Sequence, residues 1–184
     1  VVGLGNFGCC IFGELRRGGV EAVAVALSET EEFAADVRQH HALVVGDARM
    51  RATLHQAGVG SAAAVIAVTG DDAVNLSVGL ATRQLSRAAR TVVRLFDADF
   101  ARKVERGLGL DGALSASAIA APTFVAAALY EGVRDAFVID GELVTLWDHD
   151  EPDAWVGLTP EQVAREFGEQ ILLRKPRHGG GRYV

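Results

Sequence analysis

The first eight residues constrain the fold more than any other stretch of the chain. A short apolar run leads into a Gly-x-Gly-x-x-Gly sequence at residues 3–8, and an apolar helical pattern begins directly after it. In a turn between a strand and a helix, Gly3 would make the tight bend, Gly5 would let a phosphate approach the backbone, and Gly8 would let the helix pack on the strand. The helix would also point free N–H groups and a partial positive charge at an anion. This stretch therefore predicts a nucleotide-binding turn.

Apolar strand patterns and helical patterns alternate through residues 1–117. After the first apolar run, strands are predicted at about 22–27, 42–45, 62–68, 91–95 and 112–114. The helix after the first of these is expected to open at Ser28, because Ser28 and Glu31 have capping-box spacing, and to run to about Arg38. Strict alternation implies a parallel sheet with helices on both faces and ligands at the carboxyl ends of its strands. We therefore predict an α/β fold with a Rossmann-like doubly wound parallel sheet over 1–117.

The pattern changes after residue 117. Residues 118–135 predict a crossover helical segment that Pro122 interrupts, and Asp140-Gly141 between two apolar runs predicts a hairpin. Thr159 and Pro160 begin a short helix to about Phe167, and a last strand is expected at 171–173. Residues 136–184 thus predict a small α+β C-terminal subdomain. The stretch 118–130 is apolar nearly all round, so we expect it to pack against another subunit as a homo-oligomer.

Composition narrows the class of protein. The net charge is −6 and the basic residues are scattered, which argues against nucleic acid as a partner. The two cysteines, Cys9 and Cys10, are adjacent, so no disulfide framework is expected and a reducing compartment is favoured. No signal peptide or good spanning helix is evident, and the sequence opens inside an apparent strand. We expect the natural chain to begin earlier, and any membrane segment to come from that part or from another chain.

Three further features have competing interpretations. Cys9 and Cys10 follow the glycine turn, where a helix N-terminus lowers a thiol pKa, but close packing under the turn is the favoured interpretation. His40-His41 is interpreted as a solvated helix end, because adjacent histidines point apart. Asp148, Asp150, Glu151 and Asp153 form an acidic loop without the spacing of a calcium-binding loop, and an ordinary solvated turn is favoured there. No metal site is predicted.

At its strand ends the chain resembles a known family. The segments GLGNFG (3–8), VVGDA (44–48) and VTGDDAVNL (68–76), followed by 92–122, are similar to the TrkA-N type regulatory domain, also called RCK or KTN, of potassium channels and transporters. The resemblance covers about residues 1–130, and 136–175 more loosely resembles the companion TrkA-C subdomain. It implies a cytosolic gating domain at the cytoplasmic face of the membrane, assembled as a dimer or ring, that senses a ligand for a potassium channel or transporter pore in the same full-length chain or in a separate one.

The resemblance also implies a nucleotide cleft in this sequence. NAD(H) or an adenine nucleotide is the cofactor class. The phosphates would lie on the glycine turn and the adenine beside Asp47 and Ala48. Thr69, Asp72 and Asn75 would surround the ribose and phosphate side, with Arg94 nearby. The cleft residues implied are Gly3, Gly5, Asn6, Phe7, Gly8, Asp47, Ala48, Thr69, Asp72, Asn75 and Arg94.

One position departs from this pattern. Dinucleotide-binding folds place an acid at the end of the second strand to accept hydrogen bonds from the ribose hydroxyls, and here that position is Ala26. Ser28 or Glu29 could reach from the next turn only from beyond the strand end. Ala26 weakens the expectation of NAD(H) or adenine nucleotide binding and favours an alternative, a ligand-free scaffold domain kept for ring assembly.

A second alternative is a small NAD-dependent oxidoreductase. That reading needs a proton donor over the nicotinamide, and no Tyr-x-x-x-Lys pair or histidine with an acidic partner lies near a predicted strand end. We therefore expect no enzyme and no catalytic residues. The leading prediction is a regulatory domain that senses a ligand or relays its binding.

Overall fold

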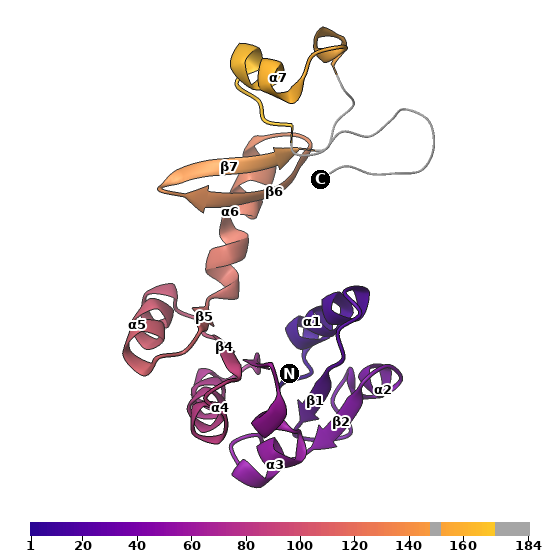
Figure 1. Cartoon of the computed structure of the whole chain (residues 1–184), viewed down its shortest axis with the longest axis vertical. Coiled ribbons are helices and arrows are strands. Elements are labelled where there is room, and N and C mark those ends of the chain that lie inside the picture. The colour runs from indigo at the N-terminus through magenta and orange to yellow at the C-terminus, as the bar shows by residue number, and fades with distance from the viewer. Residues whose placement is uncertain (148–151, 172–184) are drawn as a thin grey trace. The chain divides into compact units, whose positions relative to one another are not determined.

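The computed structural model describes residues 1–147 and 152–171 (Figure 1), and its first part is organised by one parallel sheet. Strand β1 (Val23–Ala26) pairs in parallel with β2 (Ala42–Val45), and β4 (Arg90–Arg94) pairs in parallel with both β3 (Ala64–Ala67) and β5 (Gly112–Leu114). Val2 joins the two groups, because it bridges β1 and β3 in parallel through Val25 and Ala67.

Backbone hydrogen bonds confirm this junction. The Val2 N–H donates to Ile66 O at 2.8 Å, and the Gly3 N–H donates to Val25 O at 3.0 Å. The spatial order is therefore β2-β1-Val2-β3-β4-β5, and the direction of winding reverses at Val2. Ligands in such sheets bind outside the carboxyl ends of the strands at this switch point.

Helices cover both faces of the sheet, as predicted. They are α1 (Asn6–Arg17), α2 (Ala34–Arg38), α3 (Arg51–Gln56), α4 (Asp72–Leu85) and α5 (Ala98–Leu108), with a 3₁₀ turn η1 (Val59–Ser61). Side chains alternate along β1, so Ala24 and Ala26 pack with Phe12 of α1 in one core. Val25 packs in a second core with Leu54, Val78 and Val104, which come from α3, α4 and α5. The fold is thus a doubly wound α/β sheet.

Aspartate side chains cap the N-termini of α4 and α5. Asp71 precedes α4 and accepts hydrogen bonds from the N–H groups of Ala73 and Val74. Asp97 precedes α5 and accepts from Phe100 N at 2.6 Å. Both caps satisfy orphan donors of a first turn.

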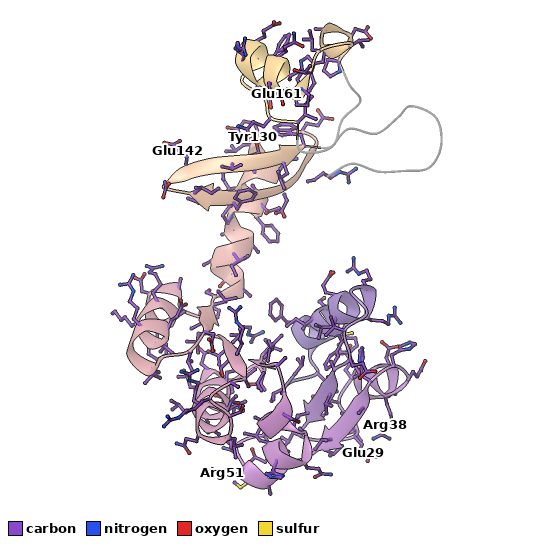
Figure 2. The ribbon with its side chains drawn as sticks, viewed as in Figure 1. Glu29, Arg38, Arg51, Tyr130, Glu142 and Glu161 are labelled. Atoms are coloured by element: carbon purple, nitrogen blue, oxygen red, sulfur yellow. The ribbon has the colours of Figure 1, made fainter. Side chains whose placement is uncertain are left out.

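The second helix begins later than predicted. Helix α2 starts at Ala34, and residues 28–31 form a turn in place of the expected capping box. The Glu31 carboxylate does not bond its own first turn, because it accepts hydrogen bonds from Leu27 N and Leu4 N. Glu29 of the same turn pairs with Arg38 at 3.3 Å on the surface, where both labelled side chains lie (Figure 2). The backbone N–H groups of Leu4 and Leu27 therefore bind the Glu31 carboxylate in place of the N-terminus of a helix opening at Ser28.

The chain divides into two compact units between Ser117 and Ala118. Helix α6 (Ala116–Leu129) is continuous through Pro122, so the predicted interruption is wrong. Strands β6 (Val133–Ile139) and β7 (Glu142–Trp147) form the predicted antiparallel hairpin around Asp140-Gly141. Asp140 and Gly141 have φ of 50° and 87°, the left-handed conformations that a tight two-residue hairpin turn requires.

Polar bonds and a cap stabilise this second unit. The Thr123 hydroxyl of α6 accepts from Ala136 N at 3.0 Å and donates to the Asp135 carboxylate at 2.5 Å, so it fastens α6 to β6. After a 3₁₀ turn η2 (Asp153–Trp155), helix α7 (Pro160–Phe167) opens with the predicted capping box. Of the strand expected at 171–173, residue 171 is not in a strand, and 172 and 173 lie outside the described residues.

Candidate functional site

The glycine turn lies at the switch point of the sheet, and helix α1 begins directly from it. Gly5 is the N-cap residue of α1 and brings no side chain to cap the first turn. The first turn contains no acidic residue, and the basic residues Arg16 and Arg17 lie in the last turn. The backbone N–H groups at the start of α1 are therefore available to an anion.

The three glycines have different surroundings. Gly3 has φ of +101°, and a Cβ there would lie 2.9 Å from Thr69 N. A Cβ on Gly8 would lie 2.0 Å from Gly3 O. A Cβ on Gly5 would meet no atom within 4 Å. Gly3 and Gly8 are thus required by packing, whereas Gly5 leaves the outer face of the turn open for a ligand.

A cation lies beside the turn. The Arg94 guanidinium carbon at the end of β4 lies 5.8 Å from the centre of the Phe7 ring, in a cation–π contact. Phe7 is the second residue of α1 and is 41 % exposed. The contact holds a positive charge next to the free N–H groups of α1, which favours an anionic group at this end of the sheet.

Asn75 joins the ends of β3 and β4. It is fully buried, and its Oδ1 accepts from Thr69 N and from the Thr69 hydroxyl, each at 2.8 Å. Its Nδ2 donates to Thr69 O at 3.1 Å and to Arg94 O at 3.0 Å. Asp72 accepts from Phe96 N at 2.9 Å. The structure thus brings Thr69, Asp72 and Asn75 to the edge of the sheet, but their polar atoms mainly fix the loops that line it.

Asp47 and Ala48 follow β2 at the same edge. The Asp47 carboxylate accepts from the side chain of Arg49, with a closest distance of 2.7 Å, and from Arg49 N at 2.9 Å. These hydrogen bonds hold the pKa of Asp47 below its ordinary value. The Ala48 side chain is buried in the core, so only its backbone faces the site. Asp47 is accessible in part and anionic, next to a paired arginine.

The residue that sequence reasoning missed is Glu31. Ala26 at the end of β1 is 1 % exposed and has no polar side chain. The half-buried Glu31 carboxylate lies beside it, where Oε1 accepts from Leu27 N at 2.6 Å and Oε2 accepts from Leu4 N at 3.3 Å. Its spacing from Ser28 indicated a helix cap, so the sequence pattern pointed away from the site.

Cys9 is not an activated thiol. Burial raises the pKa of the Cys9 thiol, and the nearby Asp36, Cys10 and Glu32 raise it further. These effects outweigh the position of Cys9 in the first turns of α1, which by itself would lower the pKa. The protonated thiol is the favoured form at neutral pH.

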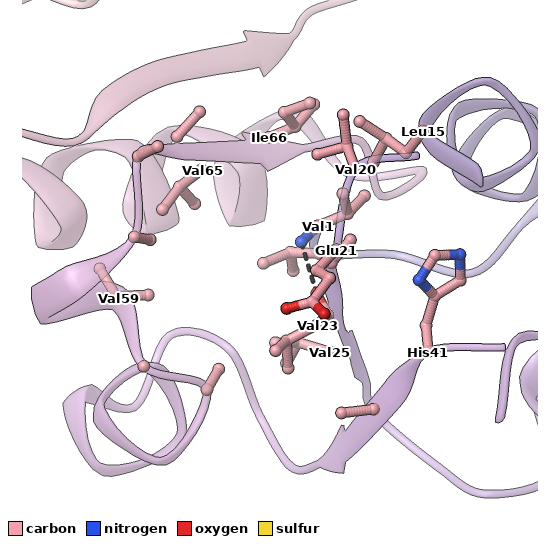
Figure 3. Close-up of a pocket in the computed structure, with 18 of the residues that line it drawn as sticks. Val1, Leu15, Val20, Glu21, Val23, Val25, His41, Val59, Val65 and Ile66 are labelled. Atoms are coloured by element: carbon pink, nitrogen blue, oxygen red, sulfur yellow. Dashed lines mark hydrogen bonds between the residues drawn. The ribbon is translucent and has the colours of Figure 1, made fainter. Parts of the chain in front are cut away.

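A cavity lies at the opposite edge of the sheet. It has a volume of about 730 Å³ and is lined by the starts of the strands, including Val1, Val23 and Ala64 (Figure 3). Val1 N donates to Val23 O at 2.7 Å. The wall is mostly apolar, and Glu21 and His41 are the charged or titratable side chains labelled in it in Figure 3. The uncapped N–H groups at the start of α1 lie at the glycine turn, so we assign the candidate site there.

Residues 1–147 and 152–171 present neither a cluster of metal ligands nor a membrane-spanning helix. Within these residues no group of three or more His, Cys, Asp and Glu side chains could hold a metal ion. The His41 ring packs against Phe12, with ring centres 5.0 Å apart. Asp148, Asp150 and Glu151 of the acidic loop lie outside the described residues. None of the helices described here has the length and apolar character needed to span a membrane.

A parallel sheet with a glycine turn, an uncapped helix N-terminus and a cation at its switch point defines a Rossmann-like type of domain. The profile of the TrkA-N domain family matches residues 1–116. The chain therefore belongs to the TrkA-N domain family, as its strand-end segments predicted. Comparison with curated proteins gave no match.

Solved structures share this fold. The Kef CTD of Shewanella denitrificans in AMP-bound form is 20 % identical, with a TM-score of 0.60 over 70 % of this chain and 76 % of that one. The GsuK RCK domain is 25 % identical, with a TM-score of 0.60 over 96 % of this chain and 37 % of that one. The GsuK channel bound to NAD is 16 % identical, with a TM-score of 0.55 over 66 % of this chain and 22 % of that one. This chain therefore spans between 22 % and 37 % of the length of these two GsuK chains.

Proposed function

We propose that this chain is a non-catalytic regulatory domain that binds an adenine nucleotide or NAD(H) at its glycine turn and relays that binding to a potassium channel or transporter. The observation that carries the proposal is the open face of the turn at Gly5. Free N–H groups of α1 and the Arg94 cation converge on this face. Membership of the TrkA-N family and the AMP-bound and NAD-bound forms of the similar structures support the same ligand class.

The relay requires assembly, and α6 offers a surface for it. Its apolar side chains are unusually exposed: Ile119 is 59 % exposed, Phe124 76 %, Val125 51 % and Leu129 66 %. Exposed apolar area of this kind marks a protein interface. We propose a homo-oligomer, a dimer or ring, in which α6 packs against a second copy. Such an assembly would act at the cytoplasmic face of the membrane, on a pore in the same natural chain or in a separate one.

A binding role accounts for the site better than catalysis does. The polar side chains at the carboxyl edge are largely committed to holding loops, as with Asn75, Asp72 and the Asp47–Arg49 pair. General acid–base catalysis needs a titratable group free to reach the reacting atom. The arrangement described here is suited to recognising a ligand and changing loop positions on binding.

Thermal melting in the presence of NAD, NADH, ATP, ADP or AMP tests the proposal. A ligand at about 100 times its dissociation constant adds about 2.7 kcal/mol to the free energy of unfolding. For a chain of this size that corresponds to a rise in Tm of roughly 5–10 °C. Gly5→Val is the control, because its side chain enters open space in the free protein but occupies the ligand face. A shift with a nucleotide that Gly5→Val abolishes supports the site, and absence of any shift overturns it.

The second candidate is a ligand-free scaffold domain. Ala26 favours it, because the strand end that normally carries a ribose-binding acid carries a buried methyl group. In that case Gly5→Val and wild-type protein would behave alike with every nucleotide, while both would keep the same oligomeric state.

A further inference from the structure

We infer that Glu31 is the ribose-recognition residue of this cleft and that it makes the cleft selective for nucleotides with a free 2′,3′-diol. The inference rests on the proposed nucleotide site and names the carboxylate within that site that accepts hydrogen bonds from the ribose hydroxyls. It concerns a position five residues beyond Ala26, where neither the strand pattern nor the glycine motif places an acid.

The first step is the location of the carboxylate. Leu27, which donates to Glu31 Oε1 at 2.6 Å, directly follows the last residue of β1. Leu4, which donates to Oε2 at 3.3 Å, lies inside the glycine turn. The carboxylate therefore spans the space between the end of β1 and the turn. A ribose attached to a phosphate on the turn would lie in this same space, because the end of this strand is where such folds bind it.

The second step is the remaining hydrogen-bonding capacity. An ionised carboxylate has about four acceptor sites, two on each oxygen. The two backbone N–H groups use one on each oxygen of Glu31. One site per oxygen is left, which suits two adjacent hydroxyl donors. Two vicinal hydroxyls of a ribose are such a pair, whereas a 2′-phosphate would place negative charge against the carboxylate.

The third step is preorganisation. Both donors to Glu31 belong to the backbone of the sheet edge and the turn, so the carboxylate is held in place before any ligand arrives. Glu31 is half-buried, which limits competition from water. Glu29, two residues earlier, is exposed and engaged with Arg38 at 3.3 Å. Glu29 is therefore the matched control: an acid of the same turn with no bond to the cleft.

The test is a calorimetric comparison of AMP and 2′-deoxy-AMP on wild-type protein, Glu31→Gln and Glu29→Gln. A charge-assisted hydrogen bond contributes about 1.5–3 kcal/mol, so wild-type protein should bind AMP roughly 10- to 150-fold more tightly than 2′-deoxy-AMP. Glu31→Gln should lose most of its affinity for AMP and keep its affinity for 2′-deoxy-AMP within about a factor of two. Glu29→Gln should behave as wild type. Adenosine 2′,5′-bisphosphate should bind Glu31→Gln better than wild type.

Three different results would contradict the inference, and only the last of them would also contradict the proposed nucleotide site. Wild-type protein that binds AMP and 2′-deoxy-AMP equally overturns the inference and leaves the nucleotide site standing, and this comparison needs no folded variant. An equal loss of affinity for AMP and 2′-deoxy-AMP in Glu31→Gln also overturns the inference, because that result would mean that Glu31 only supports the loop. Wild-type protein that binds neither nucleotide overturns the proposed function and this inference with it.

Discussion

Replacing Gly8 and Gly5 by alanine separates the packing role of the glycine turn from its ligand role. A Cβ at position 8 would lie 2.0 Å from Gly3 O, whereas close carbon–oxygen contacts are normally about 3.3–3.6 Å. The turn or α1 must therefore move by more than about 1 Å. Overpacking against backbone costs about 3 kcal/mol at the upper end of its usual range. Alanine in a helix recovers about 1 kcal/mol relative to glycine.

The net loss expected for Gly8→Ala is about 2 kcal/mol, which lowers the Tm by roughly 4–8 °C for a chain of this size. Gly5 has φ of −74° and ψ of −177°, an extended conformation open to any residue, and its Cβ would meet no atom within 4 Å. Gly5→Ala should therefore change the free energy of unfolding by less than about 1 kcal/mol. Scanning calorimetry of both variants without ligand measures the difference. Equal melting of Gly8→Ala and wild type, or a larger loss in Gly5→Ala, would refute this account of the turn.

Three further predictions concern other parts of the chain. Asn75→Ala removes the buried side chain that bonds Thr69 on both its N–H and C=O groups, and urea denaturation should show a loss of about 2–4 kcal/mol; a loss below 1 kcal/mol contradicts that role. The pKa of Asp47 is held below its ordinary value of 3.8 by Arg49, so its stabilising effect is present above pH 3.8 and is lost as the pH falls through the folded-state pKa. The Tm of wild type should therefore fall more steeply below about pH 4 than that of Asp47→Asn, and parallel curves would exclude this linkage. Phe124→Asp should convert the oligomer to a monomer in sedimentation at micromolar concentration, and an unchanged mass would remove α6 from the interface.

Local sequence signals predicted the elements whose partners are close in the chain. Strand 42–45 and helix 160–167 have their predicted limits, since one is a short apolar run and the other has its cap, proline and glutamine within four residues. The doubly wound arrangement also followed, because alternation of strands and helices leaves few topologies open. These features depend on periodicity and capping, which single sequences display directly.

The parts that could not be predicted depend on contacts distant in sequence. Glu31 has the spacing of a helix cap, but a donor 27 residues away, Leu4 N, together with Leu27 N draws its carboxylate to the sheet edge. Gly5 and Gly8 are the same residue type in the same motif, and only the folded backbone shows that one faces open space and the other Gly3 O. The sequence allowed Asn75 to be a ligand-binding amide. In the folded chain its four hydrogen bonds to Thr69 and Arg94 hold the ends of β3 and β4 together.

The most direct test of the central claim is a backbone amide NMR titration of the wild-type chain with AMP. If the nucleotide binds at the glycine turn, the amide signals of Gly5, Asn6, Phe7 and Gly8 should shift and saturate together, along with Leu27, whose N–H bonds Glu31. The account would be contradicted if these signals did not move at saturating AMP, or if the saturable shifts lay only in residues of β6, β7 and α7.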